Sequence, residues 1–303
     1  MMIDYHALKN RRFADVVQSY TARDTMLYAL GLGLGRDPLD ERDLRHVYEK
    51  DLVALPTMAV VLGSPGFWMK EPDSGIDWVK VLHGEQAVQL HRLMPAAATI
   101  VGKLRITALI DKGAGRGALV VAEREVRDVA SGELYATVRQ VTFARGDGGF
   151  SEVQGNGPKG GDAPPSALPA APESDPDQSV DFETSPRAAQ IYRLSGDYNP
   201  LHIEPAVARA AGFARPILHG LASYGVAGLA ILRECCGSDP ARLKSLSLRF
   251  SAPVYPGETL RTELWLEPGR VRFRARAMGH PLLDETQCEP GRVVLANGVA
   301  EIA

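Results

Sequence analysis

The sequence predicts an α+β protein with two similar halves, in which antiparallel strands pack against a buried helix. Three observations support this prediction. Runs of alternating or β-branched residues recur in both parts of the chain, one long apolar segment precedes the second set of runs, and a segment rich in Gly and Pro separates the two parts. With 303 residues, of which 45% are hydrophobic, the chain can bury one large core or two modest ones.

The strands are predicted from period-two alternation, which places every second side chain on one face of a sheet. Turn residues separate neighbouring runs, as in Asp111-Lys112-Gly113 and Glu267-Pro268-Gly269. We expect strands at residues 103–111, 117–126 and 133–143 in the first half, and at 245–250, 259–267, 270–278 and 292–302 in the second.

The helix is predicted at residues 220–236, which are apolar on nearly every side and should therefore be buried. The glycines of this segment lower its helix propensity, so they indicate close packing against a sheet. Cys235 and Cys236 end the segment, and we expect them to be small core residues rather than nucleophiles.

The segment from Gly146 to Pro186 is rich in Gly, Pro, Ser, Ala and Asp and has few large apolar residues. Such a composition buries too little surface to offset the entropy of ordering, which is typical of a linker. We therefore divide the chain into an N-terminal repeat at residues 1–148, a linker at 149–184 and a C-terminal repeat at 185–303.

The two halves also resemble each other in sequence. Residues 28–40 are similar to residues 192–202 if a two-residue insertion is allowed, and Leu55-Pro56 then parallels Arg215-Pro216. The order of these similarities is the same in both halves. This indicates a duplicated unit whose first copy has lost its polar groups.

Composition narrows the function. A net charge of −3 argues against a general nucleic-acid binder, and no stretch approaches the roughly 18 apolar residues that span a bilayer. The amino terminus has no apolar signal run, and the carboxyl end is not a peroxisomal Ser-Lys-Leu address. The three cysteines, two of them adjacent, suit reduced thiols. We expect a cytoplasmic protein with no nucleic-acid or membrane partner.

One short segment carries groups that can do chemistry. Asp197 and His202 lie five residues apart with Asn199-Pro200 between them. Proline fixes its own φ and favours an extended Asn199, so the segment should be a shaped loop. A carboxylate and an imidazole on such a loop can act as a general acid and base around one water. The same residues also fit an Asx-type turn beside a surface histidine, and spacing alone does not separate the two interpretations.

The wider sequence resembles the hydratase 2, or MaoC-like, family. The run Tyr192-x-Leu194-Ser195-Gly196-Asp197-x-Asn199-Pro200-Leu201-His202, with Ala208 beyond it, is similar to the family signature. Similar family segments occur in both halves, at residues 81–86, 111–113, 215–221 and 250–260. Most of the chain resembles the hydratase 2 unit of peroxisomal multifunctional β-oxidation enzymes. The resemblance implies a double hot-dog fold, in which each half wraps an antiparallel sheet around a long helix and only the second half keeps the catalytic pair.

The resemblance also implies an activity. Asp197 and His202 would activate a water that adds to Cβ of a trans-2-enoyl-CoA, giving the (3R)-hydroxyacyl-CoA. Gly220 begins the buried helix, where N–H groups are free and the helix dipole is positive, and by resemblance its N–H is the oxyanion donor. Asn199 either shapes the loop or contacts the ligand. The enzyme would be an enoyl-CoA hydratase 2, or 3-hydroxyacyl-CoA dehydratase.

Further ligand contacts follow from the resemblance. His83, Gly84 and Lys112 match positions that touch the CoA portion, and Phe250 matches one near the thioester; Lys112 also has the point charge that suits a phosphate. Solvated or structural roles stay open for Lys112 and His83, and we interpret His219 as structural. The loop residues Tyr198, Pro200 and Leu201 complete the predicted substrate site, and Tyr28, Met58, Phe67 and Trp68 are candidate walls of an acyl cavity.

No metal or redox cofactor is expected, because the thioester itself activates the substrate. His202-Ile-Glu204 begins like a zinc deaminase motif, but no Pro-Cys-x-x-Cys follows it. Two alternatives remain beside the hydratase: a MaoC-like dehydratase for a branched, dicarboxylic or ring-bearing hydroxyacyl-CoA, and a non-catalytic acyl-thioester binding protein. Assembly into a homodimer stays open.

Overall fold

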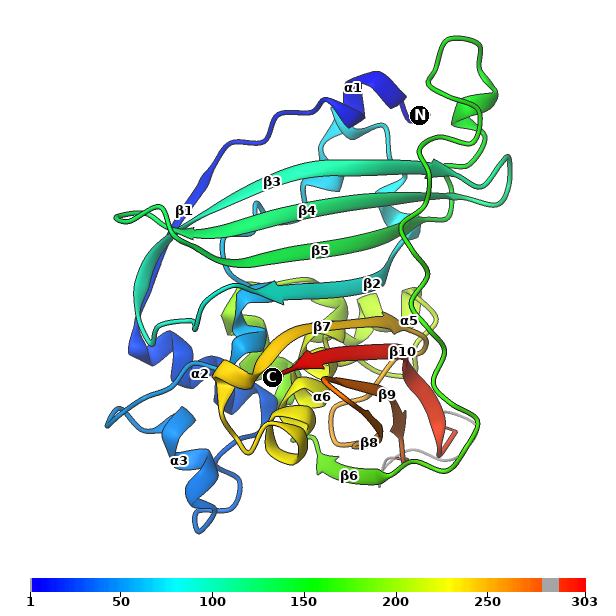
Figure 1. Cartoon of the computed structure of the whole chain (residues 1–303). Coiled ribbons are helices and arrows are strands. Elements are labelled where there is room, and N and C mark those ends of the chain that lie inside the picture. The colour runs from blue at the N-terminus through cyan, green and yellow to red at the C-terminus, as the bar shows by residue number, and fades with distance from the viewer. Residues whose placement is uncertain (1, 280–288) are drawn as a thin grey trace.

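The computed structural model describes residues 2–279 and 289–303, so Cys288 lies outside the described residues. The strands in this part of the chain form one antiparallel sheet in the order β1-β3-β4-β5-β2-β7-β10-β9-β8-β6 (Figure 1). The first half contributes β1 (Val16–Tyr20), β2 (Val81–Leu90), β3 (Ala98–Asp111), β4 (Ala118–Asp128) and β5 (Leu134–Ala144), and the second contributes β6 (Gln178–Glu183), β7 (Leu243–Phe250), β8 (Thr259–Glu267), β9 (Arg270–Ala277) and β10 (Arg292–Ile302).

The two halves of the sheet have the same topology. From the outer edge to the centre, the first half runs β1-β3-β4-β5-β2 and the second half runs β6-β8-β9-β10-β7. In each half the strands therefore follow the same order, with the second strand of the half at the centre. The two second strands, β2 and β7, pair at the centre, where Glu85 lies opposite Arg249 and Val88 opposite Leu246. A duplicated unit produces this arrangement, which agrees with the similarity between the halves in sequence.

All seven predicted strands are present, and the span predicted for β8 is the observed one. Three strands were not predicted. β1 is short and lies at a sheet edge, β2 carries polar residues and a bulge between His83 and Glu85, and β6 falls within the expected linker. β6 pairs with β8, so the second half of the sheet begins at Gln178, before the expected boundary at residue 185.

The long buried helix is α6 (Gly220–Cys235), which packs on the strands of the second half. Its glycines allow close packing, as the sequence indicates, but the atoms nearest Gly225 and Gly228 belong to the helical segments 22–32 and 56–60 of the first half instead of the sheet. A Cβ on Gly225 would lie 2.7 Å from Leu32 Cδ2, and a Cβ on Gly228 would lie 2.5 Å from Thr57 Cγ2. Cys236 is fully buried in the main core, whereas Cys235 is partly exposed and packs against it.

The expectation of a long helix in each half holds only for the second half. At the corresponding place the first half has η1 (Pro56–Val60), a single 3-10 segment that opens on a proline. The other helices are α1 (Tyr5–Lys9), α2 (Ala22–Leu32), α3 (Glu41–Val47), α4 (Ala188–Tyr192) and α5 (Pro205–Ala210), with 3-10 turns η2 (Trp68–Lys70), η3 (Pro72–Ser74), η4 (Trp78–Lys80), η5 (Phe150–Glu152), η6 (Arg193–Ser195), η7 (Pro200–His202) and η8 (Pro240–Arg242).

The four candidate cavity walls do not lie together. Tyr28 and Met58 are buried in the main core, which also contains α6. Trp68 belongs to a separate cluster beneath α1, and Phe67 is 45% exposed. These four side chains therefore do not line one cavity.

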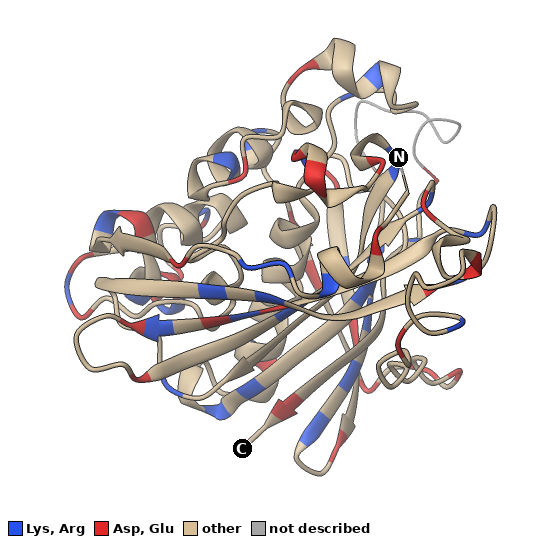
Figure 2. Cartoon of the chain, turned by 90° about the horizontal axis from the view of Figure 1, so that it is seen from above, with Lys and Arg blue, Asp and Glu red and all other residues tan. Residues whose placement is uncertain are grey.

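Residues of both charges are spread over the strands of the sheet (Figure 2). This distribution agrees with the small net charge of −3. Within residues 2–279 and 289–303, no helix has both the length and the apolar character needed to cross a bilayer.

Candidate active site

The loop that was predicted to carry chemistry turns sharply between η6 and η7. Gly196 adopts a φ of +117°, which a residue with a side chain rarely reaches. Asn199 is extended before Pro200, as expected, and its side-chain oxygen accepts a hydrogen bond from the Leu201 N–H at 3.1 Å. Asn199 therefore shapes the loop by capping η7, and His202 closes that turn.

His202 is held as a neutral imidazole with one free lone pair. Its Nδ1 lies 2.8 Å from the Ile217 carbonyl oxygen. Because a carbonyl only accepts, Nδ1 must carry the proton and Nε2 must be the bare nitrogen. Burial lowers the pKa of His202, although the Ile217 hydrogen bond and the Asp197 carboxylate act in the opposite direction. A bare Nε2 in a buried ring is suited to accept a proton at neutral pH.

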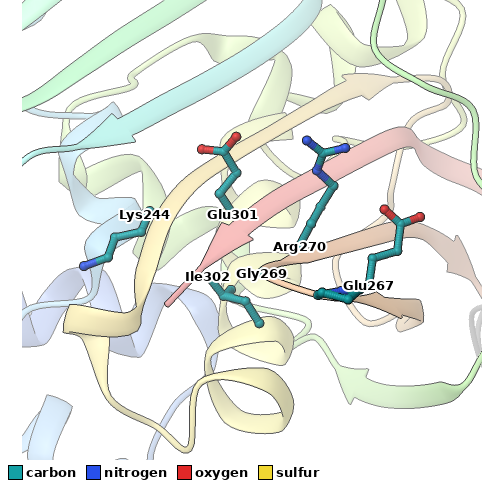
Figure 3. A pocket seen from close by; sticks show the side chains of 7 residues that line it. Lys244, Glu267, Gly269, Arg270, Glu301 and Ile302 are labelled. Carbon is teal, nitrogen blue, oxygen red and sulfur yellow. The ribbon is translucent and has the colours of Figure 1, made fainter.

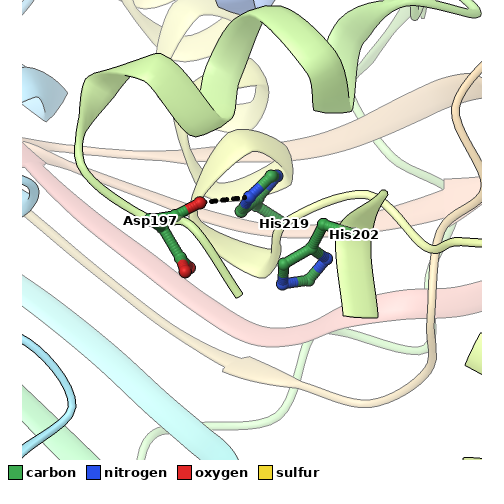
Figure 4. Close-up of side chains that lie close together, drawn as sticks. All are labelled: Asp197, His202 and His219. Carbon is green, nitrogen blue, oxygen red and sulfur yellow. Dashed lines mark hydrogen bonds between the residues drawn. The ribbon is translucent and has the colours of Figure 1, made fainter. Parts of the chain in front are cut away.

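Asp197 faces the same space from the other side of the loop. One carboxylate oxygen accepts the Asn199 N–H at 3.1 Å, and among the described residues no donor is bonded to the other oxygen. Asp197, His202 and His219 lie close together (Figure 4). One carboxylate oxygen of Asp197 and one ring nitrogen of each histidine all lie within 4.8 Å of one another. At such separations a single water is able to bridge two of the side chains by hydrogen bonds.

His219 lies directly on His202. The two ring centroids are 3.8 Å apart, with 29° between the ring planes. Imidazole lone pairs lie in the plane of the ring, so the lone pairs of stacked rings run side by side rather than converging on one ion. The site therefore suits a water better than a metal, even though one carboxylate and two imidazoles are present.

Gly220 is the first residue of α6, so its N–H has no partner within the helix. A Cβ at this position would lie 3.1 Å from Cε1 of Phe250, so only glycine leaves the ring in place. The Phe250 ring also meets His83, with the centroids 4.6 Å apart. These three predicted residues thus lie together beside the loop, although they come from β2, β7 and α6.

His83 and Gly84 lie at the bulge of β2. Burial lowers the pKa of His83 to about 4, and its Nε2 lies 3.0 Å from the Gln86 side-chain oxygen. Gly84 lies close to β5, since a Cβ there would be 3.1 Å from the Val141 oxygen. His83 is therefore a neutral ring at neutral pH, and its contact with the CoA portion stays a prediction.

The remaining predicted residues lie further out. Tyr198 is 59% exposed, with the Arg193 guanidinium 4.9 Å from its ring, and Pro200 and Leu201 form the first part of η7. Lys112 lies in the turn after β3 with its Nζ 4.9 Å from the Phe143 ring, and within the described part of the chain no contact joins it to the loop. A hollow of about 570 Å³ at the β8–β9 turn contains no predicted site residue (Figure 3).

His219 was interpreted as structural, and its contacts agree with that interpretation. Its side chain contacts both the loop, through the Asp197 main-chain oxygen, and the His202 ring. Its proximity to the loop was not predicted, and the available signal was its position immediately before Gly220, at the start of the buried helix.

The comparisons with known proteins identify the family of the chain. Residues 167–282 match the MaoC like domain, and residues 18–146 match the MFE-2 hydratase 2 N-terminal domain. The chain is 39% identical to 3-hydroxyacyl-thioester dehydratase Y of Mycobacterium tuberculosis, over 93% of this chain and 92% of that protein. It is also 39% identical to the peroxisomal enoyl-CoA hydratase 2 of Arabidopsis thaliana, over 89% of this chain and 88% of that protein.

Solved structures confirm the fold. A MaoC-like dehydratase from Phytophthora capsici superposes with a TM-score of 0.82 and 34% identity, covering 99% of each chain. A Mycobacterium tuberculosis protein described as a double hotdog fold superposes with a TM-score of 0.57 and 16% identity, a likeness that concerns the fold alone. The expected double hot-dog and the expected enzyme of the hydratase and dehydratase class are thereby confirmed. With both halves matched and the relatives covered over most of their length, the chain belongs to the MaoC-like hydratase 2 family.

Proposed function

We propose that this protein catalyses the reversible addition of water to a trans-2-enoyl-CoA, giving the (3R)-hydroxyacyl-CoA. The observation that carries the proposal is the pairing of two proton acceptors with a free helix N–H. The bare Nε2 of His202 and the second oxygen of Asp197 lie beside the start of α6, where the Gly220 N–H is unpaired within the helix. The relatives named as hydratases and dehydratases support the same reaction class.

The water is held by its two hydrogens. It donates one hydrogen bond to His202 Nε2 and one to Asp197, which directs an oxygen lone pair towards Cβ of the substrate. As the new C–O bond forms, the pair takes up a proton from the water, and a proton is returned to Cα. The water thus supplies both the hydroxyl and the hydrogen of the product.

The thioester oxygen gains negative charge while the double bond is attacked. The Gly220 N–H, at the positive end of the α6 dipole, is placed to stabilise that charge. The absence of a side chain at Gly220 lets the thioester approach the backbone closely. The His83 and Phe250 rings, which are in contact with each other, would border the same space on the other side.

The reverse reaction uses the same groups, so the site serves a 3-hydroxyacyl-CoA dehydratase equally well. The name of the Mycobacterium tuberculosis relative favours this direction for that protein. The acyl group is not determined by the catalytic groups, and kinetics with enoyl-CoA substrates from C4 to C16 would identify it.

The test follows the loss of the enoyl-thioester absorbance with crotonyl-CoA and decenoyl-CoA, with chiral analysis of the product. We expect a 3R product, and Asp197→Asn and His202→Gln should each lower kcat by about 10²- to 10⁴-fold. Asp37→Asn is a matched control, because Asp37 accepts the N–H two residues ahead at 2.9 Å as Asp197 does. An inactive wild-type enzyme, a 3S product or full activity in both site variants would each contradict the proposal.

A further inference from the structure

His219 connects the separate parts of the site. Its Nε2 lies 3.1 Å from the main-chain oxygen of Asp197, so this nitrogen carries the proton and donates it (Figure 4). One face of its ring stacks on His202 with centroids 3.8 Å apart, and Tyr192 lies 5.2 Å away. The next residue along the chain is Gly220.

From these contacts we infer that His219 is a positioning residue for the proposed hydration. Its N–H fixes the peptide from which the Asp197 carboxylate projects, its ring fixes the plane of His202, and its backbone begins the helix that presents the Gly220 N–H. A single buried side chain therefore holds the base and the carboxylate in one geometry, next to the oxyanion donor of the following residue. The inference rests on the proposed function, since positioning has meaning only if those groups react together.

The buried Nδ1 of His219, which has no hydrogen-bond partner among the described residues, indicates that the residue does more than fill space. The residue is 1% exposed. Burying an unpaired acceptor destabilises a fold, and a phenylalanine would occupy a similar volume without this penalty. What phenylalanine lacks is the N–H that reaches the Asp197 carbonyl. The use of histidine here is thus explained by that hydrogen bond.

The inference is tested with two substitutions that separate the ring from the donor. His219→Phe keeps an aromatic ring between Tyr192 and His202 but removes the N–H. His219→Gln removes the ring but carries an amide N–H at a similar distance from the backbone as Nε2. We measure kcat and KM for crotonyl-CoA, with the melting temperature of each variant recorded in parallel.

We expect His219→Phe to lower kcat by about 10- to 100-fold with KM changed less than about threefold, because the groups are misplaced while binding is kept. His219→Gln should recover most of that loss. A His219→Phe enzyme that melts normally and keeps the wild-type kcat would overturn the inference, as would equal loss in both variants. If His219→Phe does not fold, His219→Asn replaces it, because the asparagine amide is one methylene too short to reach the Asp197 carbonyl. His219→Asn should then have a lower kcat than His219→Gln.

The proposed function and this inference can fail separately. A wild-type protein without hydratase or dehydratase activity would contradict the proposed function itself. An active wild type that loses activity in Asp197→Asn, but not in His219→Phe, would contradict only the positioning role.

Discussion

Replacing Gly220 by alanine tests the start of α6 as the place where the thioester binds. The new Cβ would lie 3.1, 3.3 and 3.5 Å from Cε1, Cδ1 and Cζ of Phe250. Carbon atoms prefer separations of about 3.5–4.0 Å, so the ring must move by a few tenths of an ångström. Overpacking of this kind typically destabilises a protein by about 1–3 kcal/mol, while alanine gains about 1 kcal/mol over glycine in a helix. The net loss of stability should therefore be about 1 kcal/mol.

The loss of activity should be larger than that change in stability suggests. The methyl group occupies the space that the thioester needs in order to reach the Gly220 N–H, so we expect kcat/KM for crotonyl-CoA to fall by about 10- to 100-fold. Urea unfolding of the same variant measures the change in stability.

A second substitution separates the two effects. Phe250→Leu removes the ring that the new methyl group would strike, so Gly220→Ala in the Phe250→Leu background should no longer destabilise the fold. The activity should stay low in the double variant, because the methyl group still blocks the approach of the thioester. A Gly220→Ala enzyme with undiminished kcat/KM would refute the assignment of this helix start as the oxyanion site.

Three further predictions concern charge and proton binding. Asp197→Asn should change the melting temperature by no more than a few degrees, because the side-chain amide oxygen can still accept the Asn199 N–H; calorimetry of the inactive variant checks this. His202 and His219 are buried as neutral rings with lowered pKa values, about 4 for His219, so protonation favours the unfolded chain and the urea midpoint should fall as the pH drops from about 6.5 towards 4. Asp43→Asn should destabilise the fold by about 1–2 kcal/mol, because it removes one of the two carboxylates that pair with the partly buried Arg233 and leaves Asp40 at 3.8 Å, whereas Arg261→Gln at an exposed ion pair should cost less than about 1 kcal/mol in urea unfolding.

The sequence was most informative where a signal is local. Alternation predicted the seven strands with strong period-two patterns, and the apolar run predicted α6 to within one residue at its end. The loop at Asp197 was also predicted, because proline and glycine restrict the backbone whatever surrounds them. These elements depend on neighbours a few residues away, which a single sequence displays.

The contacts that complete the site depend on residues far apart in the chain. His83 meets Phe250 only because β2 pairs with β7, and strand order is not encoded in either strand alone. The stacking of His219 on His202 likewise requires the helix start and the loop to be docked. The missing helix of the first half could not be read from periodicity, since the segment around η1 is buried and apolar like a helix core.

The two copies differ at the positions that carry the proposed site. In the alignment that matches Arg215-Pro216 with Leu55-Pro56, the positions of His219 and Gly220 are held by Ala59 and Val60. The first copy therefore has neither the imidazole that orients a loop nor the glycine that exposes a helix N–H.

In the first copy the carbonyl of Val60, the residue that aligns with Gly220, is also hydrogen-bonded. The Val60 carbonyl accepts a hydrogen bond from Arg124 Nη2 at 2.7 Å, and the Arg124 side chain is buried against it. Arg124 therefore caps the C-terminal end of η1 at the position that aligns with the start of α6. In the proposed function the first half supplies His83 through β2, but at this position it has the end of a 3-10 segment instead of a helix start whose N–H groups lack partners within the helix.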